Sequence, residues 1–491
     1  MSGSRLDQKR TKIVATIGPA SSDEQTLRAI IRGGMNVARI NFSHGEHVIH
    51  GETIDRIRHV AREENEVVAI MCDLQGPKIR IGQIRQEPLE LDQGDSVRLT
   101  LNASLANSDR HTLLLPHPEF MRDVHQGMPL LLDDGDLEFL VTARDEETLT
   151  CRVITGGALY SRKGVTAPTA HLTLSAITDK DREDLKFALQ KQTDFVALSF
   201  VRSGRDLQNL RSLIDESGCE VDPWLIAKIE KREALQNIEE IVAESDGIMV
   251  ARGDLGVETP AEEVPGHQKH IIRLCNQAGK PVITATQMLN SMVESPRPTR
   301  AEASDVYNAI MDGSDAVMLS NETAVGSYPV ISVETMASIA VIAERALLSG
   351  WTPGRIKAHP DHEERERMSD AISEATSRIA AVLDCRAVVT STHSGYTTRQ
   401  IARERSRTPI LCVTPSDHIF RRMALVWGVI PMLVPHFSTT DEMIGTVVRA
   451  ANRAGMVERG HRLVIIAGVP FGIGGQTNFL KVHVVGEADE L

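Results

Sequence analysis

Short apolar runs recur along the chain, and most of them are followed by a turn and then by a helical pattern. In the helical segments apolar residues return every three to four positions, as in the helix predicted over 232–244, where Leu235, Ile238 and Ile241 share one face. We interpret the apolar runs themselves as strands. The strands predicted in this way are 12–17, 37–42, 67–72, 195–200, 225–229, 248–251, 282–285 and 316–319.

Two of the predicted helices begin with the spacing of a capping box. Ser22 and Gln25 have this spacing before a helix that is expected to end at 33–34, and Thr299 and Glu302 have it at the start of another helix. Eight strand–helix units with short connections indicate a parallel sheet, and eight is the number that closes a (β/α)8 TIM barrel. An open, doubly wound sheet is the alternative that the pattern leaves open.

Two stretches do not follow the strand–helix pattern. Residues 77–173 carry period-2 runs separated by turns, which predict a small inserted β-barrel at the mouth of the main barrel, where a lid would lie. Residues 351–367 are polar and contain two prolines, and we interpret them as a linker. The insert's predicted strands are 97–101, 137–141 and 148–154, with turns at 134–135 and 144–146.

Beyond the linker, four apolar runs at 387–390, 410–413, 463–467 and 482–485 alternate with helices. This pattern predicts a separate α/β domain. The predicted domains are a barrel of residues 1–76 and 174–350, an inserted β domain of residues 77–173, and a C-terminal α/β domain of residues 351–491.

Composition and charge narrow the class of protein. Hydrophobic residues make up 41% and charged residues 25% of the 491 positions, which is ordinary for a globular protein. The formal net charge of −13 argues against nucleic acid or an anionic membrane as the main partner, since both call for basic surfaces. The six cysteines form no C-x-x-C pair, which argues against a disulfide framework. The start resembles no secretory signal and no run reaches membrane-spanning length, so we expect a cytoplasmic protein.

Polar residues gather at the carboxyl ends of the predicted strands, where a (β/α)8 barrel forms its active site. The second strand ends with Arg39, Asn41 and Ser43 on one face, a set that suits phosphate or cation binding, although a polar strand edge has the same pattern. The fifth strand ends with Lys228 and Glu230, again on one face. These two residues would point into the mouth, or would form a structural ion pair.

The later strand ends add to this set. The sixth strand leads into Gly253 and Asp254, where backbone N–H groups could approach an anion and the carboxylate could hold a metal, although the sequence is also that of an ordinary turn. Thr286 and Ser320 follow the seventh and eighth strands, at positions where such residues are often simple caps. The coincidence of two carboxylates, a lysine and several hydroxyls at one end of successive strands favours an active site.

Two other groups of potential metal ligands are interpreted differently. The three aspartates of segment 133–136 fall at a hairpin turn of the insert and are expected to be solvated. The three histidines of segment 44–50 are three residues apart, with no cysteine or strand-end carboxylate near them in sequence, and are expected to form a half-exposed helix start. We therefore expect no zinc site.

Seven motifs, in order along essentially the whole chain, together resemble the pyruvate kinase family. They are TKIVATIGPAS, VARINFSHG, DLQGPKIR, IAKIEKREAL, VARGDLGVE, ATQMLNSM and PTRAEASDVYNAIMDGSDAVMLSNETA. The resemblance implies transfer of the phosphoryl group of phosphoenolpyruvate to ADP, giving ATP and pyruvate through an enolate, as the last step of glycolysis. It also implies a requirement for Mg²⁺, for which Mn²⁺ can substitute, a homotetramer, and allosteric control through the C-terminal domain.

The resemblance also implies roles for single residues. Glu230 and Asp254 resemble the Mg²⁺ ligands, and Lys228 resembles the ammonium that neutralises the transferring phosphoryl group and the enolate. The other matched positions are Arg39 for the phosphoryl group; Gly253, Asp254 and Thr286 for the substrate carboxylate; Thr286 and Ser320 for the proton path to the enolate carbon; Pro19, His44, Arg80 and Lys163 for the nucleotide; and Asn41, Ser43 and Asp73 for a monovalent cation.

The chain departs from the family pattern near the predicted cation pocket and in the insert. Lys78 stands where many relatives have glutamate, and Leu74 replaces a common threonine. Because an ammonium group at this place could take the position of the cation, we expect that K⁺ is not required. The exit from the insert reads KGVTAP over 163–168, where asparagine-leucine-proline is more usual.

A second anion site is predicted in the C-terminal domain. After the strand that ends at Thr390, a loop rich in hydroxyls leads into a helix start, which suits a phosphate group, although an ordinary capped loop has the same pattern. The later loop 469–475 lacks the basic side chains expected for a second phosphate, so we expect a sugar monophosphate or AMP as effector, not fructose 1,6-bisphosphate. The predicted effector residues are Thr392, Ser394, Gly395 and Thr397.

Two alternatives to a pyruvate kinase remain at this point. A metal-dependent aldolase or lyase that forms pyruvate enolates on a related barrel would not need a nucleotide lid, nor Arg39 together with Lys228. A catalytically silent metabolite sensor would not need the catalytic residues that this chain retains.

Overall fold

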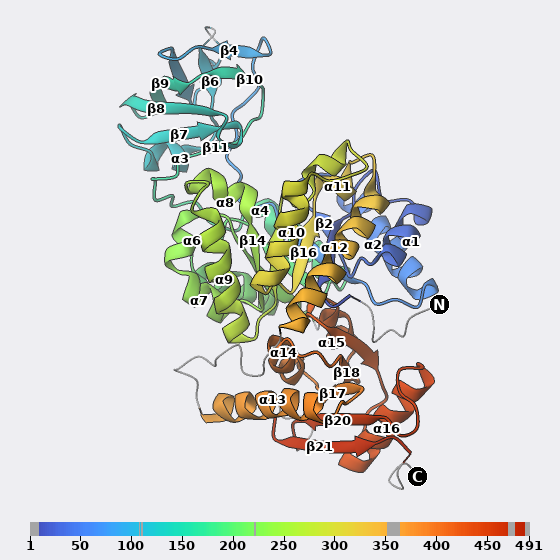
Figure 1. The fold of residues 1–491 in the computed structure, drawn as a ribbon. Coiled ribbons are helices and arrows are strands. Elements are labelled where there is room, and N and C mark those ends of the chain that lie inside the picture. The colour runs from blue at the N-terminus through green and yellow to red at the C-terminus, as the bar shows by residue number, and fades with distance from the viewer. Residues whose placement is uncertain are drawn as a thin grey trace.

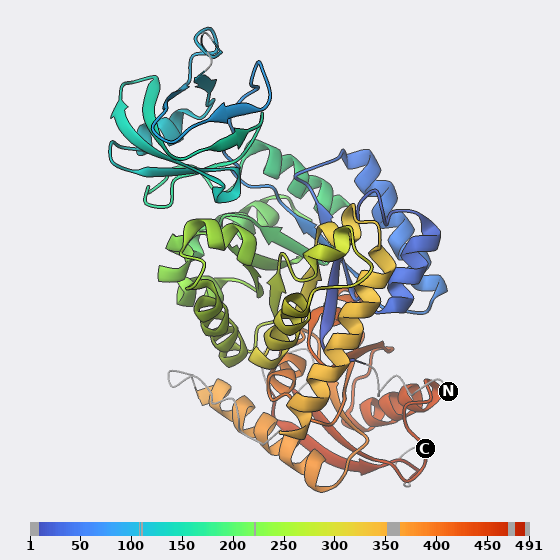
Figure 2. The ribbon, with the colours of Figure 1, turned by 45° about the horizontal axis from the view of Figure 1, so that its top comes forward.

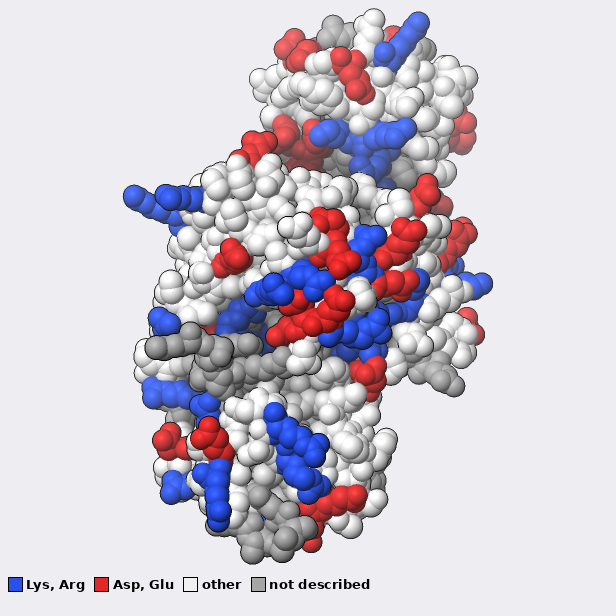
Figure 3. Space-filling view, turned by 90° about the vertical axis from the view of Figure 1, so that its right-hand side faces the viewer, with Lys and Arg blue, Asp and Glu red and all other residues white. Residues whose placement is uncertain are grey.

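The computed structural model describes residues 9–107, 109, 111–219, 222–350, 364–469 and 477–486. It has three parts in a row: the insert at the top, the barrel in the middle and the C-terminal domain at the bottom (Figure 1). Turned by 45°, the ring of helices around the barrel separates clearly from the strands of the insert (Figure 2). Acidic and basic side chains are interspersed on the barrel face that Figure 3 shows.

Eight parallel strands form a closed barrel, since β1 pairs with both β2 and β16. The closed ring confirms the (β/α)8 barrel and excludes the open sheet. The strands are β1 (Lys12–Thr16), β2 (Val37–Asn41), β3 (Ala69–Asp73), β12 (Phe195–Leu198), β13 (Trp224–Ile229), β14 (Gly247–Ala251), β15 (Val282–Ala285) and β16 (Ala316–Leu319).

Alternate residues of each strand face different cores, as the period of two requires. Residues such as Ile40 and Val196 pack outward against the helices. Residues such as Val37 and Ile226 fill the barrel, and this inner core continues into the C-terminal domain through Met423. The surrounding helices are α1 (Glu24–Gly33), α2 (His47–Glu63), α4 (Asp179–Gln190), α5 (Gly204–Glu216), α6 (Arg232–Gln236), α7 (Ile238–Glu244), α9 (Val264–Ala278), α10 (Arg300–Asp312) and α12 (Pro329–Ser349).

Three predictions about helix ends can be compared with the structure: one capping box is confirmed, one capping box is wrong, and one predicted helix is divided in two. Thr299 and Glu302 form the predicted capping box of α10. The predicted box of Ser22 and Gln25 is wrong, because α1 is capped one residue later by Asp23, whose carboxylate accepts from the Thr26 N–H at 2.9 Å. The single helix predicted over 232–244 is broken at Asn237 into α6 and α7.

The described residues of the insert form eight strands around one apolar core, arranged as a six-stranded sheet of order β11-β7-β8-β9-β5-β6 and a two-stranded sheet of β10 and β4. The predicted strands correspond to β5, β8 and β9. The other five have two to four residues, too few for a periodic pattern. The elements are β4 (Leu89–Leu91), β5 (Ser96–Thr100), β6 (Thr112–Leu114), α3 (Pro118–Asp123), β7 (Pro129–Leu132), β8 (Leu137–Arg144), β9 (Thr148–Thr155), β10 (Gly157–Leu159) and β11 (Val165–Thr166).

The C-terminal domain is a five-stranded sheet of order β19-β18-β17-β20-β21. Of the predicted linker, 351–363 lies outside the described residues, and the remainder is wrong because 364–367 belong to α13. β19, which contains Pro431, was not predicted. The elements are α13 (Glu364–Val382), β17 (Ala387–Ser391), α14 (Tyr396–Arg403), β18 (Ile410–Thr414), α15 (Asp417–Arg422), β19 (Val429–Leu433), α16 (Thr440–Arg453), β20 (Arg462–Ala467) and β21 (Phe479–Val484).

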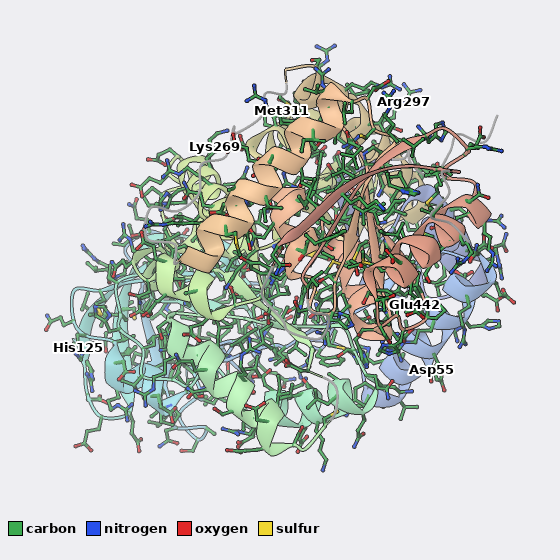
Figure 4. The ribbon with its side chains drawn as sticks, turned by 90° about the horizontal axis from the view of Figure 1, so that it is seen from below. Asp55, His125, Lys269, Arg297, Met311 and Glu442 are labelled. Atoms are coloured by element: carbon green, nitrogen blue, oxygen red, sulfur yellow. The ribbon has the colours of Figure 1, made fainter. Side chains whose placement is uncertain are left out.

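The C-terminal domain closes the amino end of the barrel. Arg421 forms an ion pair with the buried Asp194 at 2.7 Å, and Arg405 forms one with Asp315 at 3.0 Å. Seen from below, this domain lies in front of the barrel, with Glu442 of α16 well away from His125 of the insert (Figure 4). The carboxyl end of the barrel is therefore the end that faces the insert. In the described part of the chain, no helix has the length and apolar character needed to cross a membrane.

Candidate active site

Inward positions near the carboxyl ends of four strands, together with Ser199 directly after β12, form a polar layer above the apolar interior of the barrel. Each residue of this layer lies two positions after an apolar residue that points into the barrel, as the strand period of two requires. The residues of this layer are Thr16, Arg39, Asp73, Ser199 and Lys228. All five are nearly inaccessible to solvent. A buried polar layer is stable only when its members bind one another.

The layer is held by one buried network centred on Asp73. Arg39 Nε lies 2.6 Å from Asp73 Oδ2, and Lys228 Nζ lies 3.3 Å from Asp73 Oδ1. Arg39 also donates to Thr16 Oγ1 at 2.9 Å, and Lys228 donates to Ser199 Oγ at 2.7 Å. The structure thus brings Arg39 and Lys228, which are far apart in sequence, to the same carboxylate.

Burial and charge act in opposite directions on this network. Burial alone would raise the pKa of Asp73, but Lys228 and Arg39 hold it below its ordinary value. Burial alone would lower the pKa of Lys228, but the carboxylates of Asp73 and Glu230 raise it above its ordinary value. Lys228 is therefore a permanently charged ammonium group inside the barrel mouth.

Glu230 is the second carboxylate bound to Lys228. Its Oε1 lies 2.8 Å from Lys228 Nζ, and its Oε2 accepts from the Phe200 N–H at 2.7 Å. Phe200 has a left-handed backbone conformation, with φ of 56°. In this conformation its N–H points at the Glu230 carboxylate. Burial raises the pKa of Glu230, and the charge of Asp254 raises it further, against the opposing effect of Lys228. A second cation beside Glu230 would relieve this repulsion.

Asp254 is the second carboxylate at the place where a cation could bind beside Glu230. It lies in the first turn of α8 (Arg252–Glu258), directly after Gly253, and is half-buried. It lines the same cavity as Glu230, between the barrel mouth and Gly164 of the insert. Among the residues that the structure describes, none binds the Asp254 carboxylate by a hydrogen bond or an ion pair. Two carboxylates that line one cavity suit a divalent metal with oxygen ligands.

Thr286 is tied to the same turn. The Gly253 N–H donates to Thr286 Oγ1 at 2.7 Å. Thr286 has φ of 68° and Gln287 has φ of 55°, and such left-handed backbone is unusual for a β-branched residue. Ser320 follows β16, and its N–H donates to Glu322 Oε2 at 2.7 Å. Glu322 also accepts from the Leu289 N–H at 3.1 Å, so this buried carboxylate joins the loops that carry Thr286 and Ser320.

The residues predicted to bind a monovalent cation lie around the same strand ends. Asn41 and Asp73 are register partners on β2 and β3, and Asn41 Oδ1 accepts from the Ser43 N–H at 3.1 Å. The Asp73 carboxylate is bound by two cationic side chains. Lys78 is half-buried and lines the cavity that contains Glu230.

The predicted nucleotide residues fall into two groups. Pro19 and His44 lie exposed on loops after β1 and β2. Arg80 and Lys163 lie on the two chain segments that enter and leave the insert, and Arg80 forms a bridge with Gly164. Among the described residues, no hydrogen bond or ion pair joins the two groups.

Side-chain contacts correct the interpretation of the aspartates in segment 133–136 and confirm that of the histidines in segment 44–50. Asp133 is not solvated as expected, since it pairs with Lys163 at 2.6 Å and its side chain is 17% exposed; its neighbours Asp134 and Asp136 are exposed. The histidine segment is a helix start, as predicted, because α2 begins at His47, whose ring stacks on Phe187 with 4.5 Å between centroids.

The predicted effector loop joins β17 to α14. Thr392 Oγ1 accepts from the Gly395 N–H at 2.9 Å, and Ser394 Oγ accepts from the Tyr396 N–H at 3.4 Å. Thr397 shares a hydrogen bond of 2.9 Å with Thr477. Both arginines of α14 have other partners: Arg399 lies over the Trp224 ring of the barrel, 4.9 Å from its centroid, and Arg403 pairs with Asp370 of α13. Of the later loop, residues 470–475 lie outside the described residues.

Four residues of the site were not predicted from the sequence. Thr16 and Ser199 continue the inward period of their segments, and that signal could have found them. Glu322 and Arg252 form hydrogen bonds with backbone groups of other loops. Such contacts between distant segments produce no local pattern in the sequence.

Comparisons with known proteins agree with this geometry. Family models of the pyruvate kinase barrel domain and the pyruvate kinase alpha/beta domain match residues 8–333 and 370–483. A pyruvate kinase of Geobacillus stearothermophilus is 46% identical over 482 residues, 98% of this chain and 81% of that protein. One of Clostridium acetobutylicum is 43% identical over 477 residues, 97% of this chain and 100% of that protein. A solved pyruvate kinase from Cryptosporidium parvum has a TM-score of 0.88 and 34% identity, covering 98% of this chain and 97% of its own. The matches run through all three parts of the molecule.

Proposed function

The chain belongs to the pyruvate kinase family of phosphotransferases, and we propose that its chemistry is carried by Lys228, Glu230 and Asp254 at the barrel mouth. Phosphoenolpyruvate and ADP are the substrates that this family membership implies. The observation that carries the proposal is the placement of the buried Lys228 ammonium group 2.8 Å from Glu230, which lines the same cavity as Asp254. The family assignment also answers the choice between a kinase and an aldolase, because the matched relatives are named pyruvate kinases over nearly the whole chain.

We propose that Glu230 and Asp254 hold Mg²⁺. Carboxylate oxygens are the ligands that Mg²⁺ prefers; burial and the charge of Asp254 raise the pKa of Glu230 despite its pair with Lys228, so a further cation would favour the ionised form. Glu230 keeps lone pairs for a metal although it binds Lys228 and Phe200, since a carboxylate offers about four acceptor positions. When bound, Mg²⁺ supplies positive charge to the transferring phosphoryl group and to the enolate oxygen.

The protein's own groups supply the remaining charge and the orientation. Phosphoryl transfer needs positioned positive charge more than covalent help, and Lys228 and Arg39 provide two such charges. Asp73 fixes both cations through ion pairs of 3.3 and 2.6 Å, so little reorganisation is needed as charge develops. Thr286, beside Gly253, is placed at the mouth to take part in proton transfer to the enolate carbon, with Ser320 on the neighbouring loop. The insert borders the cavity at the mouth, and its closure over the mouth would exclude water and prevent hydrolysis.

Removal of divalent metal tests this proposal. We expect enzyme freed of metal with EDTA to lose ATP formation and to regain it with Mg²⁺ or Mn²⁺. The metal should also bind without nucleotide, because both carboxylates belong to the protein; Mn²⁺ binding followed by paramagnetic resonance measures this directly. An enzyme that binds no Mn²⁺ in the absence of nucleotide would contradict the assignment.

Lys78 leads to a prediction about K⁺. Its ammonium group is proposed to replace a monovalent cation beside Asn41, Ser43 and Asp73, so the unmodified enzyme should work equally well without K⁺. Lys78→Glu should create a K⁺ requirement, because the new carboxylate leaves the pocket short of positive charge. Initial rates in bulky organic cations, then with K⁺ at constant ionic strength, measure this. Strong activation of the unmodified enzyme by K⁺ would reject the idea.

The C-terminal loop is proposed to bind a phosphorylated effector through Thr392, Ser394, Gly395 and Thr397. Hydroxyls and N–H groups at the start of α14 can donate to a phosphate group, and the loop is already ordered by its own hydrogen bonds. We expect activation by AMP or a sugar monophosphate, and little by fructose 1,6-bisphosphate.

The double variant Thr392→Ala, Ser394→Ala should lose that activation and keep the unstimulated rate. Steady-state rates with AMP, glucose 6-phosphate and ribose 5-phosphate provide the measurement. Ser416→Ala is a matched control, since Ser416 caps α15 in the same domain but lies on another loop. A double variant that is activated as strongly as the control would remove this loop as the effector site.

Three further features are proposed, the first from the family resemblance and the other two from the sequence pattern. They are a homotetramer, a cytoplasmic location, and a division into a barrel (1–76 and 174–350), a lid (77–173) and an effector-binding domain (351–491).

A further inference from the structure

Thr286 and Gln287 have adjacent left-handed backbone conformations, with φ of 68° and 55°. Such a conformation is costly for a β-branched residue, and it persists only when surrounding groups impose it. The hydrogen bond from the Gly253 N–H fixes the Thr286 hydroxyl, but it does not fix the Thr286 peptide. Some other group must hold the backbone.

Arg252 supplies that group. Its guanidinium donates to the Thr286 carbonyl oxygen at 3.0 Å and to the Ala285 carbonyl oxygen at 3.4 Å. We propose that Arg252 is a positioning residue, which holds Thr286 in its left-handed conformation and ties it to the turn of Gly253 and Asp254. Because Arg252 directly precedes Gly253, one side chain joins the proposed metal turn to the proposed proton-transfer residue.

The orientation of the guanidinium is itself fixed by other helices. Arg252 Nη1 lies 2.7 Å from Asp305 Oδ1 on α10 and 3.4 Å from Gln268 Oε1 on α9. The Arg252 side chain is 13% exposed and that of Asp305 is 37% exposed, so the guanidinium is largely shielded while its partner reaches the surface. A lysine could keep a charge near Asp305, but it has no planar fork to bind the acid and the two carbonyls together. The arrangement therefore requires arginine at this position and not only a positive charge.

The inference rests on the proposed role of Thr286 in proton transfer. That role is measured by the exchange of the methyl protons of pyruvate with deuterated water, followed by NMR. Arg252→Lys is expected to lower both this exchange and ATP formation at least about 10-fold, with a smaller change in KM for phosphoenolpyruvate. Asp305→Asn, which keeps Arg252 and loosens it, should lower exchange about threefold or more.

Chemical rescue separates positioning from a structural role. In Arg252→Ala, millimolar guanidinium should restore exchange at least about fivefold, because the added ion can bind the two carbonyls. Arg211 is a matched control: its guanidinium lies 3.1 Å from Asp246, before β14 at the other end of the barrel. Arg211→Ala should show no rescue and near-normal exchange per folded molecule, judged by circular dichroism and thermal unfolding.

The outcomes decide the matter. Exchange within twofold of the parent in Arg252→Lys overturns the inference, as does the absence of rescue in folded Arg252→Ala. If Arg252→Lys fails to fold, Asp305→Asn decides, and normal exchange in that variant overturns the inference. Normal exchange in Thr286→Ala would instead overturn the proposed role of Thr286. If both roles are correct, adding Arg252→Lys to Thr286→Ala should cause little further loss.

Discussion

Replacing Lys228 with methionine is expected to lower the rate of ATP formation by about 10²–10³-fold, the effect of losing one preorganised charge at a reacting group. Methionine has a similar length, so the change removes the charge and its hydrogen bonds with little change in volume. The ammonium group lies 2.8 Å from Glu230 and 3.3 Å from Asp73, and no other lysine in the described structure reaches both carboxylates. Steady-state kinetics with phosphoenolpyruvate and ADP measure the loss.

The same substitution should separate two steps of the reaction. Exchange of the methyl protons of pyruvate need not fall as far as phosphoryl transfer, because Thr286 and the metal ligands remain. Near-normal ATP synthesis by folded Lys228→Met would remove Lys228 from the chemistry.

The stability of the variant must be followed in parallel. Removing one partner from a buried ion network costs about 3–5 kcal/mol, since Asp73 and Glu230 would stay buried with less compensating charge. Lys280→Met is a suitable control for this effect. Lys280 is half-buried, and it binds the carbonyl oxygens of Val242, Ala243 and Ser245 near the opposite end of the barrel. Its loss should lower stability and leave the turnover of folded enzyme near that of the parent.

The strand pattern predicted the fold well because each barrel strand is a short apolar run with a period of two. That period also placed Arg39 and Lys228 on inward faces. It could not show that both bind Asp73, because the partners lie on β2, β3 and β13 and meet only when the barrel closes. Pair contacts between distant segments are a property of the closed ring, not of any one strand.

The sequence also could not predict unusual local backbone conformations. The left-handed conformation of Thr286 is unusual for its residue type, so propensity predicts against it. The break at Asn237 is similar: the apolar face continues through it, but the Asn237 side chain donates to the Arg202 carbonyl oxygen at 2.9 Å, and the helix is interrupted there. In the turn of segment 133–136, Asp133 was expected to be solvated because its partner Lys163 is thirty positions away.

The second large effect is expected at the proposed metal ligands. Asp254→Asn and Glu230→Gln should each raise the Mg²⁺ concentration needed for half-maximal activity by about 10-fold or more. Asp254→Asn is the cleaner change, because it leaves the ion pair of Lys228 with Glu230 intact. Glu258→Gln is a matched control, since Glu258 lines the same cavity and belongs to the same helix but pairs with Lys231. Titration of activity and of Mn²⁺ binding supplies the measurement.

The pH dependence gives this prediction a second readout. Burial and the charge of Asp254 raise the pKa of Glu230 above its ordinary value, and a metal binds only the ionised carboxylate. Protons should therefore compete with Mg²⁺, so that the half-saturating Mg²⁺ concentration rises as pH falls through the pKa of Glu230. In Glu230→Gln this part of the pH dependence should disappear, because the amide does not titrate. A variant that titrates with Mg²⁺ as the parent does, at every pH, would show that the replaced residue is not a ligand.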